Sequence, residues 1–182
     1  MVEVKGPNVM LGYLGQQDLT NEVLLDGWYT TGDIGHLDAD GFLWITDRLA
    51  RFSKIAGEMV PHGLVEQVLL EQLEQLVSEK LQSEEGGSGK RAGGNARMGD
   101  LAVTSIEHPT RGEDLVVLHA DLPIDPALLV EKLGQSDLPA LFCPRLSHYV
   151  PVKEIPLLGS GKQDLRALRE LAGKAFSKAK SS

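Results

Sequence analysis

The stretch GWYTTGDIGHLDADGFLWITDRLARFSKIAGEMVP, Gly27–Pro61, contains two predicted β-hairpins in succession. In the first, Asp40-Gly41 supplies a tight turn between two arms rich in β-forming residues. In the second, Gly57 interrupts the β-prone run RFSKIAGEMV. The arm Phe42–Ile45 is almost continuously apolar, so we expect both of its faces to be covered. The stretch therefore predicts short antiparallel strands.

Helical periodicity begins where this stretch ends. Apolar residues recur at spacings of three and four with glutamates between them, which predicts a helix over about 62–82: Leu64, Val65, Val68, Leu69, Leu73 and Leu76. Two strands follow, DLAVTSIEH and EDLVVLHA, joined by a turn at 109–112. We then expect a helix from Pro126 to about Lys132, a strand at about 146–153, and a last helix from Gln163 to about Phe176. This mixed order indicates an α+β fold, a short antiparallel sheet flanked by helices.

Composition divides the chain into two parts. Residues 1–49 are rich in β signals but too few to build a core of their own, so we expect them to be the end of something larger. Residues 50–182 have the elements of a small α+β domain. Within it, SEEGGSGKRAGGNARMG at 83–99 has six glycines and no periodicity, which is typical of a flexible surface loop.

Charge and cysteine content limit the partners, metal sites and cellular compartment that we expect for the chain. The net charge is −8, yet residues 145–182 carry 8 Lys and Arg against 3 Asp and Glu. A basic C-terminal end could face a polyanion such as nucleotide phosphates, an acidic carrier protein or anionic lipid, or it could be a solvated helix with a frayed tail. The single cysteine, Cys143, favours a reducing compartment, and the scattered histidines predict no zinc site. We find no signal peptide and no apolar run long enough to span a membrane.

Two GSGK sequences, ending at Lys90 and Lys162, were tested against the phosphate-binding P-loop. That loop needs a glycine six positions before the lysine and a Ser or Thr after it. Both sequences fail at both positions, so the sequence does not predict a P-loop nucleotidase. Lys90 lies in low-complexity sequence, whereas Lys162 lies on a short turn between a strand and a helix. A lysine on such a turn can present its ammonium to one anionic target with little loss of entropy.

Four motifs in order resemble the adenylate-forming enzymes, which include acyl-CoA synthetases, luciferases and the adenylation domains of peptide synthetases. They are KGPNVMLGYL followed by DLT, then YTTGD, then TDRLARFSKIAGEMV, and finally PLLGSGKQDL. FSKIAGEMV and IPLLGSGK resemble in particular the bacterial enzymes that load acyl carrier protein in lysophospholipid reacylation. The resemblance implies that residues 1–49 end a large N-terminal adenylation domain and that 50–182 form the mobile C-terminal domain. The phosphate loop and most of the acyl pocket would lie outside this chain.

The resemblance also implies roles for single residues. Asp33 would accept hydrogen bonds from both ribose hydroxyls of ATP, with Gly32 allowing close approach and Arg48 adding a cationic fork; Tyr29 opens that motif. Lys162 would stabilise the negative charge that builds up between carboxylate and α-phosphate. Lys54 and Gly57 match the segment that lines the pantetheine tunnel in the second step. The pivot position is Ala50, where Asp or Lys is common, so a charged hinge contact is absent.

The activity implied is that of an ATP-dependent fatty acid ligase. It would form acyl-AMP and pass the acyl group to the phosphopantetheine thiol of acyl carrier protein, with Mg²⁺ bound outside this chain, and the chain alone would be inactive. The alternatives are an acyl-CoA ligase, which differs only in the thiol, and a non-catalytic module that docks a carrier through its basic tail. No nucleic acid partner is expected. The parent protein would act on the cytoplasmic side of a bacterial cell, at the inner membrane.

Overall fold

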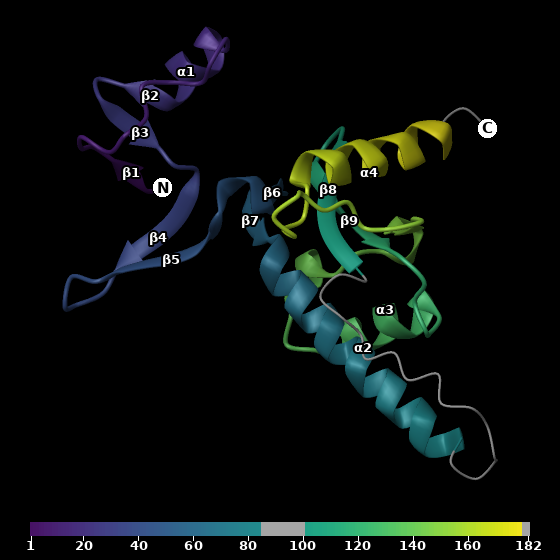
Figure 1. The fold of residues 1–182 in the computed structure, drawn as a ribbon. Coiled ribbons are helices and arrows are strands. Elements are labelled where there is room, and N and C mark those ends of the chain that lie inside the picture. The colour runs from purple at the N-terminus through teal and green to yellow at the C-terminus, as the bar shows by residue number, and fades with distance from the viewer. Residues whose placement is uncertain (85–100, 180–182) are drawn as a thin grey trace. The chain divides into compact units, whose positions relative to one another are not determined.

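A computed structural model describes residues 1–84 and 101–179 of the chain (Figure 1). The chain divides into two compact units, Met1–Arg51 and Phe52–Ser182. The predicted loop at 83–99 lies, from residue 85 onward, outside the described residues. Residues 83 and 84 belong to the preceding helix, so that helix extends slightly beyond its predicted end.

The first unit combines two small antiparallel sheets with one short helix. Strands β1 (Glu3–Val4), β3 (Trp28–Thr30) and β2 (Leu24–Leu25) form one sheet in that order. Strands β4 (Asp33–Leu37) and β5 (Leu43–Arg48) form the other. The helix α1 (Gln17–Val23) was not predicted, because its seven residues are too few to show helical periodicity.

The β4–β5 hairpin confirms the turn predicted at Asp40-Gly41. Gly41 has φ +84, a conformation that glycine adopts without strain. The Asp38 carboxylate organises the turn, since Oδ1 accepts from the backbone N–H groups of Asp40 and Phe42. Its second oxygen, Oδ2, accepts from the indole N–H of Trp44 at 2.7 Å. These three donors lower the pKa of the Asp38 carboxyl.

The expectation that Phe42–Ile45 would be covered on both faces is wrong for this chain. Between 51% and 67% of the surface of these four side chains is exposed. The reason is geometric, because β4 and β5 form a two-stranded sheet and no described residue of Met1–Arg51 supplies a second layer for β5. An apolar run of this kind predicts burial but does not say which surface provides it.

The second unit is built around strand β9 (Gly112–His119). Strand β8 (Leu101–His108) pairs antiparallel with β9 along its whole length, from Leu101 with His119 to His108 with Gly112. The short β10 (Tyr149–Pro151) pairs parallel with the end of β9, and Ile55 of β6 (Phe52–Ile55) pairs with Gly112. Strand β7 (Glu58–Pro61) completes the sheet as the partner of β6. The predicted antiparallel sheet is therefore confirmed, with one parallel pair added.

Both faces of the β8–β9 hairpin are buried, because side chains alternate across it. Leu101, Val103, Leu115 and Val117 point to one face, where they pack with the apolar stripe of α2 (His62–Glu84) and with α3 (Pro126–Gly134). Ala102, Val116 and Leu118 point to the other, where Leu168 and Ala172 of α4 (Leu165–Ala179) cover them. Figure 1 shows α4 on one side of β8 and β9 and α2 and α3 on the other. Burying each such leucine or valine stabilises the fold by about 1.5–3 kcal/mol.

The predicted C-terminal elements are confirmed with shifted limits. The strand expected at 146–153 is Tyr149–Pro151 alone, preceded by a 3-10 turn at Leu146–His148. The last helix begins at Leu165 rather than Gln163, because the Asp164 carboxylate accepts from the backbone N–H groups of Arg166 and Ala167 as an N-terminal cap. Among the described helices none is long and apolar enough to cross a membrane.

His119 makes the stability of the second unit depend on pH. Its side chain is buried, Nδ1 has no hydrogen-bond partner among the described residues, and burial lowers the pKa of the imidazole. The unfolded chain, with a histidine pKa of about 6.5, therefore binds a proton at a higher pH than the folded chain does. The contribution of His119 to the free energy of unfolding is therefore fully present above the unfolded-state pKa. It is lost as the pH falls from that pKa towards the lower pKa of the folded chain.

We expect urea denaturation to show a larger loss of stability between about pH 8 and pH 5.5 for the natural chain than for His119→Gln. Equal losses in both proteins would contradict the assignment of this pH dependence to His119.

Candidate functional site

Two of the residues predicted to contact ATP meet in the first unit. Asp33 and Arg48 are register partners on β4 and β5, and Arg48 Nε lies 3.0 Å from Asp33 Oδ1. The Asp33 side chain is 24% exposed and that of Arg48 is 65% exposed, so solvent reaches both. An ion pair this exposed adds little stability, at most about 1 kcal/mol. The arrangement offers a ligand one carboxylate and one guanidinium on the same edge of a hairpin.

The turn that presents Asp33 is held by backbone contacts from distant segments. Gly32 has φ +76, which favours glycine, and its carbonyl accepts from the N–H of Leu49 at 2.8 Å. Val2 donates its N–H to the Asp33 carbonyl at 2.7 Å. The Thr31 hydroxyl donates to the Val2 carbonyl and accepts from the Asp33 N–H. Sequence reasoning did not single out Thr31, whose hydroxyl fixes the approach to Asp33.

Tyr29 lies in β3, which leads into this turn, and remains a neutral phenol. A hydrogen bond between the Tyr13 and Tyr29 side chains raises the pKa of Tyr29, and burial raises it further. The protonated hydroxyl can therefore serve as a hydrogen-bond donor or acceptor near Asp33 at neutral pH. Tyr13 lies in the KGPNVMLGYL segment, so the structure links the first two of the four motifs.

The second group of predicted residues lies on the turn between β6 and β7. Ala56 has φ +50 and Gly57 has φ +95, the pattern of the tight turn that favours hairpins. A Cβ added at Gly57 would meet no atom within 4 Å, so the backbone there borders open space. Lys54, in β6, is exposed, and its ammonium makes no hydrogen bond or ion pair with another described residue.

The β8–β9 turn holds this segment in place. Glu113 accepts from the Lys54 backbone N–H at 2.7 Å and from the Ser105 hydroxyl at 2.6 Å, and Ala56 donates its N–H to the Arg111 carbonyl. Gly112 has φ +87, and a Cβ there would stand 2.6 Å from the Lys54 carbonyl oxygen. Lys54 and Gly57 together line an open cleft of about 1030 Å³ that the β8–β9 turn completes. Glu113 and Gly112 were not predicted, because both contacts join residues far apart in the sequence.

Lys162 lies on a separate loop that is closed by its own backbone. Leu157 and Gln163 pair across the loop, Leu158 donates its N–H to the Lys162 carbonyl at 2.7 Å, and Gly161 donates to Leu158 at 2.8 Å. Gly161 has φ +79, so the second glycine of GSGK is required by the backbone. Lys162 is exposed and its ammonium has no partner among the described residues. The loop thus fixes the backbone of Lys162 while leaving its side chain available.

The structure groups the predicted residues into three places. Tyr29, Gly32, Asp33 and Arg48 share the first unit, Lys54 and Gly57 share the cleft in the second, and Lys162 has its own loop. Ala50 lies in the 3-10 turn Leu49–Arg51, next to the boundary between the two units. Its assignment as a pivot, like the roles of the other residues, stays a prediction.

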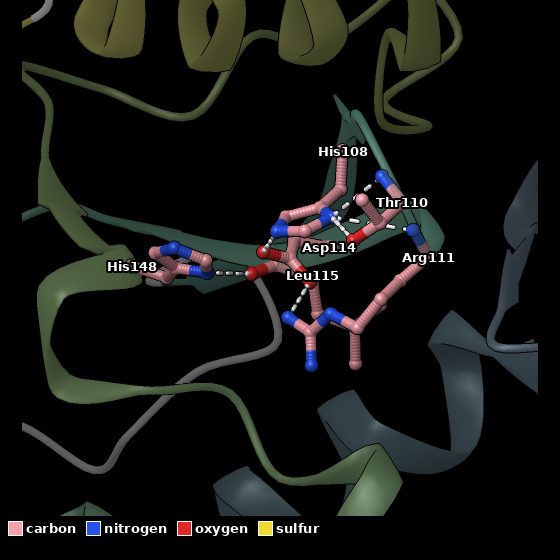
Figure 2. A network of polar contacts seen from close by, with 6 residues as sticks. All are labelled: His108, Thr110, Arg111, Asp114, Leu115 and His148. Atoms are coloured by element: carbon pink, nitrogen blue, oxygen red, sulfur yellow. Dashed lines mark hydrogen bonds and ion pairs between the residues drawn. The ribbon is translucent and has the colours of Figure 1, made fainter.

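Sequence reasoning missed a polar network on the β8–β9 turn (Figure 2). His108 Nδ1 accepts from the Thr110 and Arg111 backbone N–H groups, both at 3.3 Å. Arg111 pairs with Asp114, which also lies 3.9 Å from His108 Nε2. In the sequence this network is indicated only by the predicted turn PTRG. The turn alone does not predict that the His108 side chain accepts hydrogen bonds from its backbone. No set of three acidic, His or Cys residues within the described part of the chain could hold a metal ion.

No protein-family model matches the chain. Among curated proteins it is similar to 2-succinylbenzoate–CoA ligase of Bacillus cytotoxicus, with 44% identity over 69 residues, or 38% of this chain and 14% of that protein. It is also similar to probable 4-coumarate–CoA ligase 2 of Dictyostelium discoideum, with 48% identity over 68 residues, or 37% of this chain and 12% of that protein. The chain therefore spans about one seventh of the length of these relatives.

Solved structures resemble the chain over most of its length. An amide bond synthetase, McbA from Marinactinospora thermotolerans, matches with TM-score 0.61 and 28% identity, covering 93% of this chain and 30% of that chain. o-Succinylbenzoate CoA synthetase from Bacillus subtilis, solved with an acyl-adenylate, matches with TM-score 0.62 and 23% identity, covering 91% and 29%. This second likeness shows the fold alone. The two curated relatives and McbA support the adenylate-forming superfamily, and none of them is named as a carrier-protein synthetase.

A substitution at Gly112 tests the close approach of the β8–β9 turn to the Lys54 backbone. Gly112→Ala should lower the free energy of unfolding by about 2–4 kcal/mol, since the new Cβ combines a left-handed φ with a clash against the Lys54 carbonyl. The control is Gly134→Ala at the end of α3, where φ is ordinary and a Cβ meets nothing within 4 Å. Similar stabilities of the two variants in chemical denaturation would contradict the close approach at Gly112.

Proposed function

We propose that this chain is the C-terminal part of an ATP-dependent ligase that activates a carboxylate as acyl-AMP and transfers the acyl group to a thiol. The observation that carries the proposal is the pairing of Asp33 with Arg48 at 3.0 Å on an exposed hairpin edge, within a chain whose relatives are named as CoA ligases. Residues 1–49 would end the large adenylation domain, and 50–182 would be the mobile C-terminal domain. The complete site would include residues outside this chain.

In the first half-reaction, a carboxylate oxygen attacks the α-phosphorus of ATP and the bond to pyrophosphate breaks. Asp33 would accept hydrogen bonds from the ribose hydroxyls while Arg48 holds one of its oxygens in place. Gly32 and Tyr29 would shape the turn on which the nucleotide rests. Mg²⁺ would accompany the phosphates, and we assign it no ligand in this chain.

Lys162 would supply the positive charge for that step. Its loop is rigid in the backbone and its ammonium has no partner among the described residues, which are the properties of a preorganised electrostatic donor. The ammonium would lie against the oxygens that gain negative charge as the carboxylate meets the α-phosphate. No proton transfer is needed for this role.

In the second half-reaction, a thiolate attacks the acyl carbon of acyl-AMP and AMP leaves. Lys54 and Gly57 would line the route of the pantetheine arm, since the cleft is open and Gly57 has no side chain to obstruct it. Exchange between the two half-reactions would need the second unit to turn relative to the first. Ala50, in the turn next to the unit boundary, is the proposed pivot.

The exposed apolar surface of the first unit fits the proposal that residues 1–49 are the end of a larger adenylation domain. Trp28, Phe42, Leu43, Trp44 and Ile45 are exposed by 47% to 67%, more apolar surface than so small a unit normally leaves in water. We propose that they pack against the remainder of the large adenylation domain. That domain would then be the obligatory partner of this chain, and the chain alone would be inactive.

The acceptor thiol distinguishes two candidates. The names of the curated relatives favour CoA. The resemblance of FSKIAGEMV and IPLLGSGK to carrier-protein synthetases favours acyl carrier protein, with a fatty acid as substrate and lysophospholipid reacylation at the bacterial inner membrane as the setting. We place CoA first, because it is supported by matched relatives rather than by two short motifs.

In the proposed mechanism Lys162 acts in acyl-AMP formation and Lys54 acts in thioester formation. A variant of Lys162 tests this assignment in the intact enzyme. Lys162→Ala should slow acyl-AMP formation by roughly a hundredfold to a thousandfold while leaving thioester formation from supplied acyl-AMP unchanged. Lys153→Ala, on an exposed lysine outside both sites, serves as the control. If Lys162→Ala slowed both half-reactions equally, the proposed division between the two lysines would be wrong.

The acceptor is decided by offering both thiols to the intact enzyme. We expect thioester formation from acyl-AMP with CoA to exceed that with acyl carrier protein by at least tenfold in kcat/KM, a difference of about 1.4 kcal/mol in transition-state binding. A preference of that size for the carrier protein would reverse the order of the two candidates while leaving the adenylation step intact.

A further inference from the structure

A second pocket lies next to the Lys54 cleft and shares with it the lining residues Glu107, His108, Pro109 and Glu113. It has a volume of about 740 Å³ and is bounded by α4, by the segment just before β10, and by β8 and β9. Its lining includes Ser105, Asp114, Arg145, His148, Arg169 and Phe176. None of the four motifs assigned a role to these six residues. The volume is that of a site for a small molecule.

The charged groups of this pocket are unequally engaged. Glu113 already accepts from the Lys54 N–H and the Ser105 hydroxyl, and Asp114 already pairs with Arg111. Arg145 and Arg169, by contrast, are exposed, and their guanidinium groups make no hydrogen bond or ion pair with another described residue. Among the carboxylates that line the pocket, only Glu107 is likewise exposed and without a side-chain hydrogen bond or ion pair to another described residue. The unengaged charges therefore favour an anion.

His148 adds a ring nitrogen in a fixed position. Its ring is buried, and Nδ1 donates to the Leu115 carbonyl at 2.9 Å, which holds the imidazole against β9 (Figure 2). The ring edge also packs on Phe176 at a centroid distance of 5.0 Å and an interplanar angle of 89°. With Nδ1 committed to the backbone, Nε2 is the ring nitrogen left for a ligand.

Space for the ligand comes from a glycine in α4. Arg169, Gly173 and Phe176 recur at helical spacing on the face of α4 that borders the pocket, beside the buried Leu168 and Ala172. A Cβ added at Gly173 would meet no atom within 4 Å. The Phe176 ring and Pro109 supply an apolar wall next to the two arginines. A guanidinium fork matches a phosphate bidentately, and an aromatic wall suits a planar group.

We propose that this pocket binds a small phosphate-bearing ligand with a planar portion, the chemistry of a nucleoside phosphate, through Arg145, Arg169 and His148. Arg145, His148 and Arg169 line this pocket and not the Lys54 cleft, and the proposal does not depend on the proposed ligase function. Because all of its lining residues belong to the second unit, the chain as it stands should bind the ligand without any further domain.

The test is a titration of the 182-residue chain followed by NMR, with ADP, inorganic phosphate and adenosine as three separate probes. ADP should cause saturable shifts in the backbone signals of Arg145–His148 and Arg169–Ser177. Phosphate should shift the same signals with weaker affinity, and adenosine should bind most weakly. Arg145→Gln and Arg169→Gln should each weaken ADP binding roughly tenfold.

Two further variants separate a built site from general attraction to a basic helix. Arg166→Gln removes an equal charge one turn earlier on α4, from an arginine that pairs with Glu170 and does not line the pocket. It should leave ADP affinity within about twofold, since a charge outside the pocket contributes only through screened solvent. Gly173→Leu should abolish saturable binding without changing the net charge.

The proposal is overturned if no probe saturates, or if Arg166→Gln weakens binding as much as Arg169→Gln does. It is also overturned if Gly173→Leu binds ADP normally. Should Gly173→Leu fail to fold, as judged by loss of signal dispersion, the comparison of Arg169→Gln with Arg166→Gln decides alone. If adenosine binds as tightly as ADP, the phosphate assignment is wrong.

Discussion

The burial of the β8–β9 hairpin on both faces is the constraint on which the second unit depends. Leu101, Val103 and their neighbours close one core with α2 and α3, while Val116 and Leu118 close the other with α4. Because both faces are occupied, functional groups can lie only at the ends and edges of the hairpin. The Lys54 cleft and the pocket lined by Arg145 and Arg169 both lie against its turn, where they share Glu107, His108, Pro109 and Glu113.

The same hairpin anchors the segments that carry the two predicted lysines. Ile55, next to Lys54, pairs with Gly112 at one end of β9, and β10, which precedes the Lys162 loop, pairs with Val117–His119 at the other. Both lysines therefore belong to segments attached to one sheet of the second unit. If they act in different half-reactions, as proposed, exchanging them requires motion of that unit.

The sequence predicted the hairpins, the long helix and the order of the remaining elements, because these follow from short-range turn chemistry and periodicity. Asp40-Gly41 and Ala56-Gly57 are local turns. The apolar periodicity of α2 can be recognised in the sequence without knowing what the helix packs against. It did not predict α1, whose helix is too short to show a period. It also mispredicted the cover of Phe42–Ile45, because burial depends on a partner surface that an apolar run does not specify.

For the candidate site, the sequence by itself determined which residue types stand at motif positions: Asp33, Arg48, Lys54, Gly57 and Lys162. Only the tertiary structure decided what those residues contact. The 3.0 Å pair of Asp33 with Arg48 depends on the register of β4 and β5, and the hold of Glu113 on the Lys54 backbone joins residues 59 positions apart. The physical reason is range: turns and periods are encoded within a few neighbouring residues, whereas close approach between distant segments is fixed only once both faces of β8 and β9 are packed.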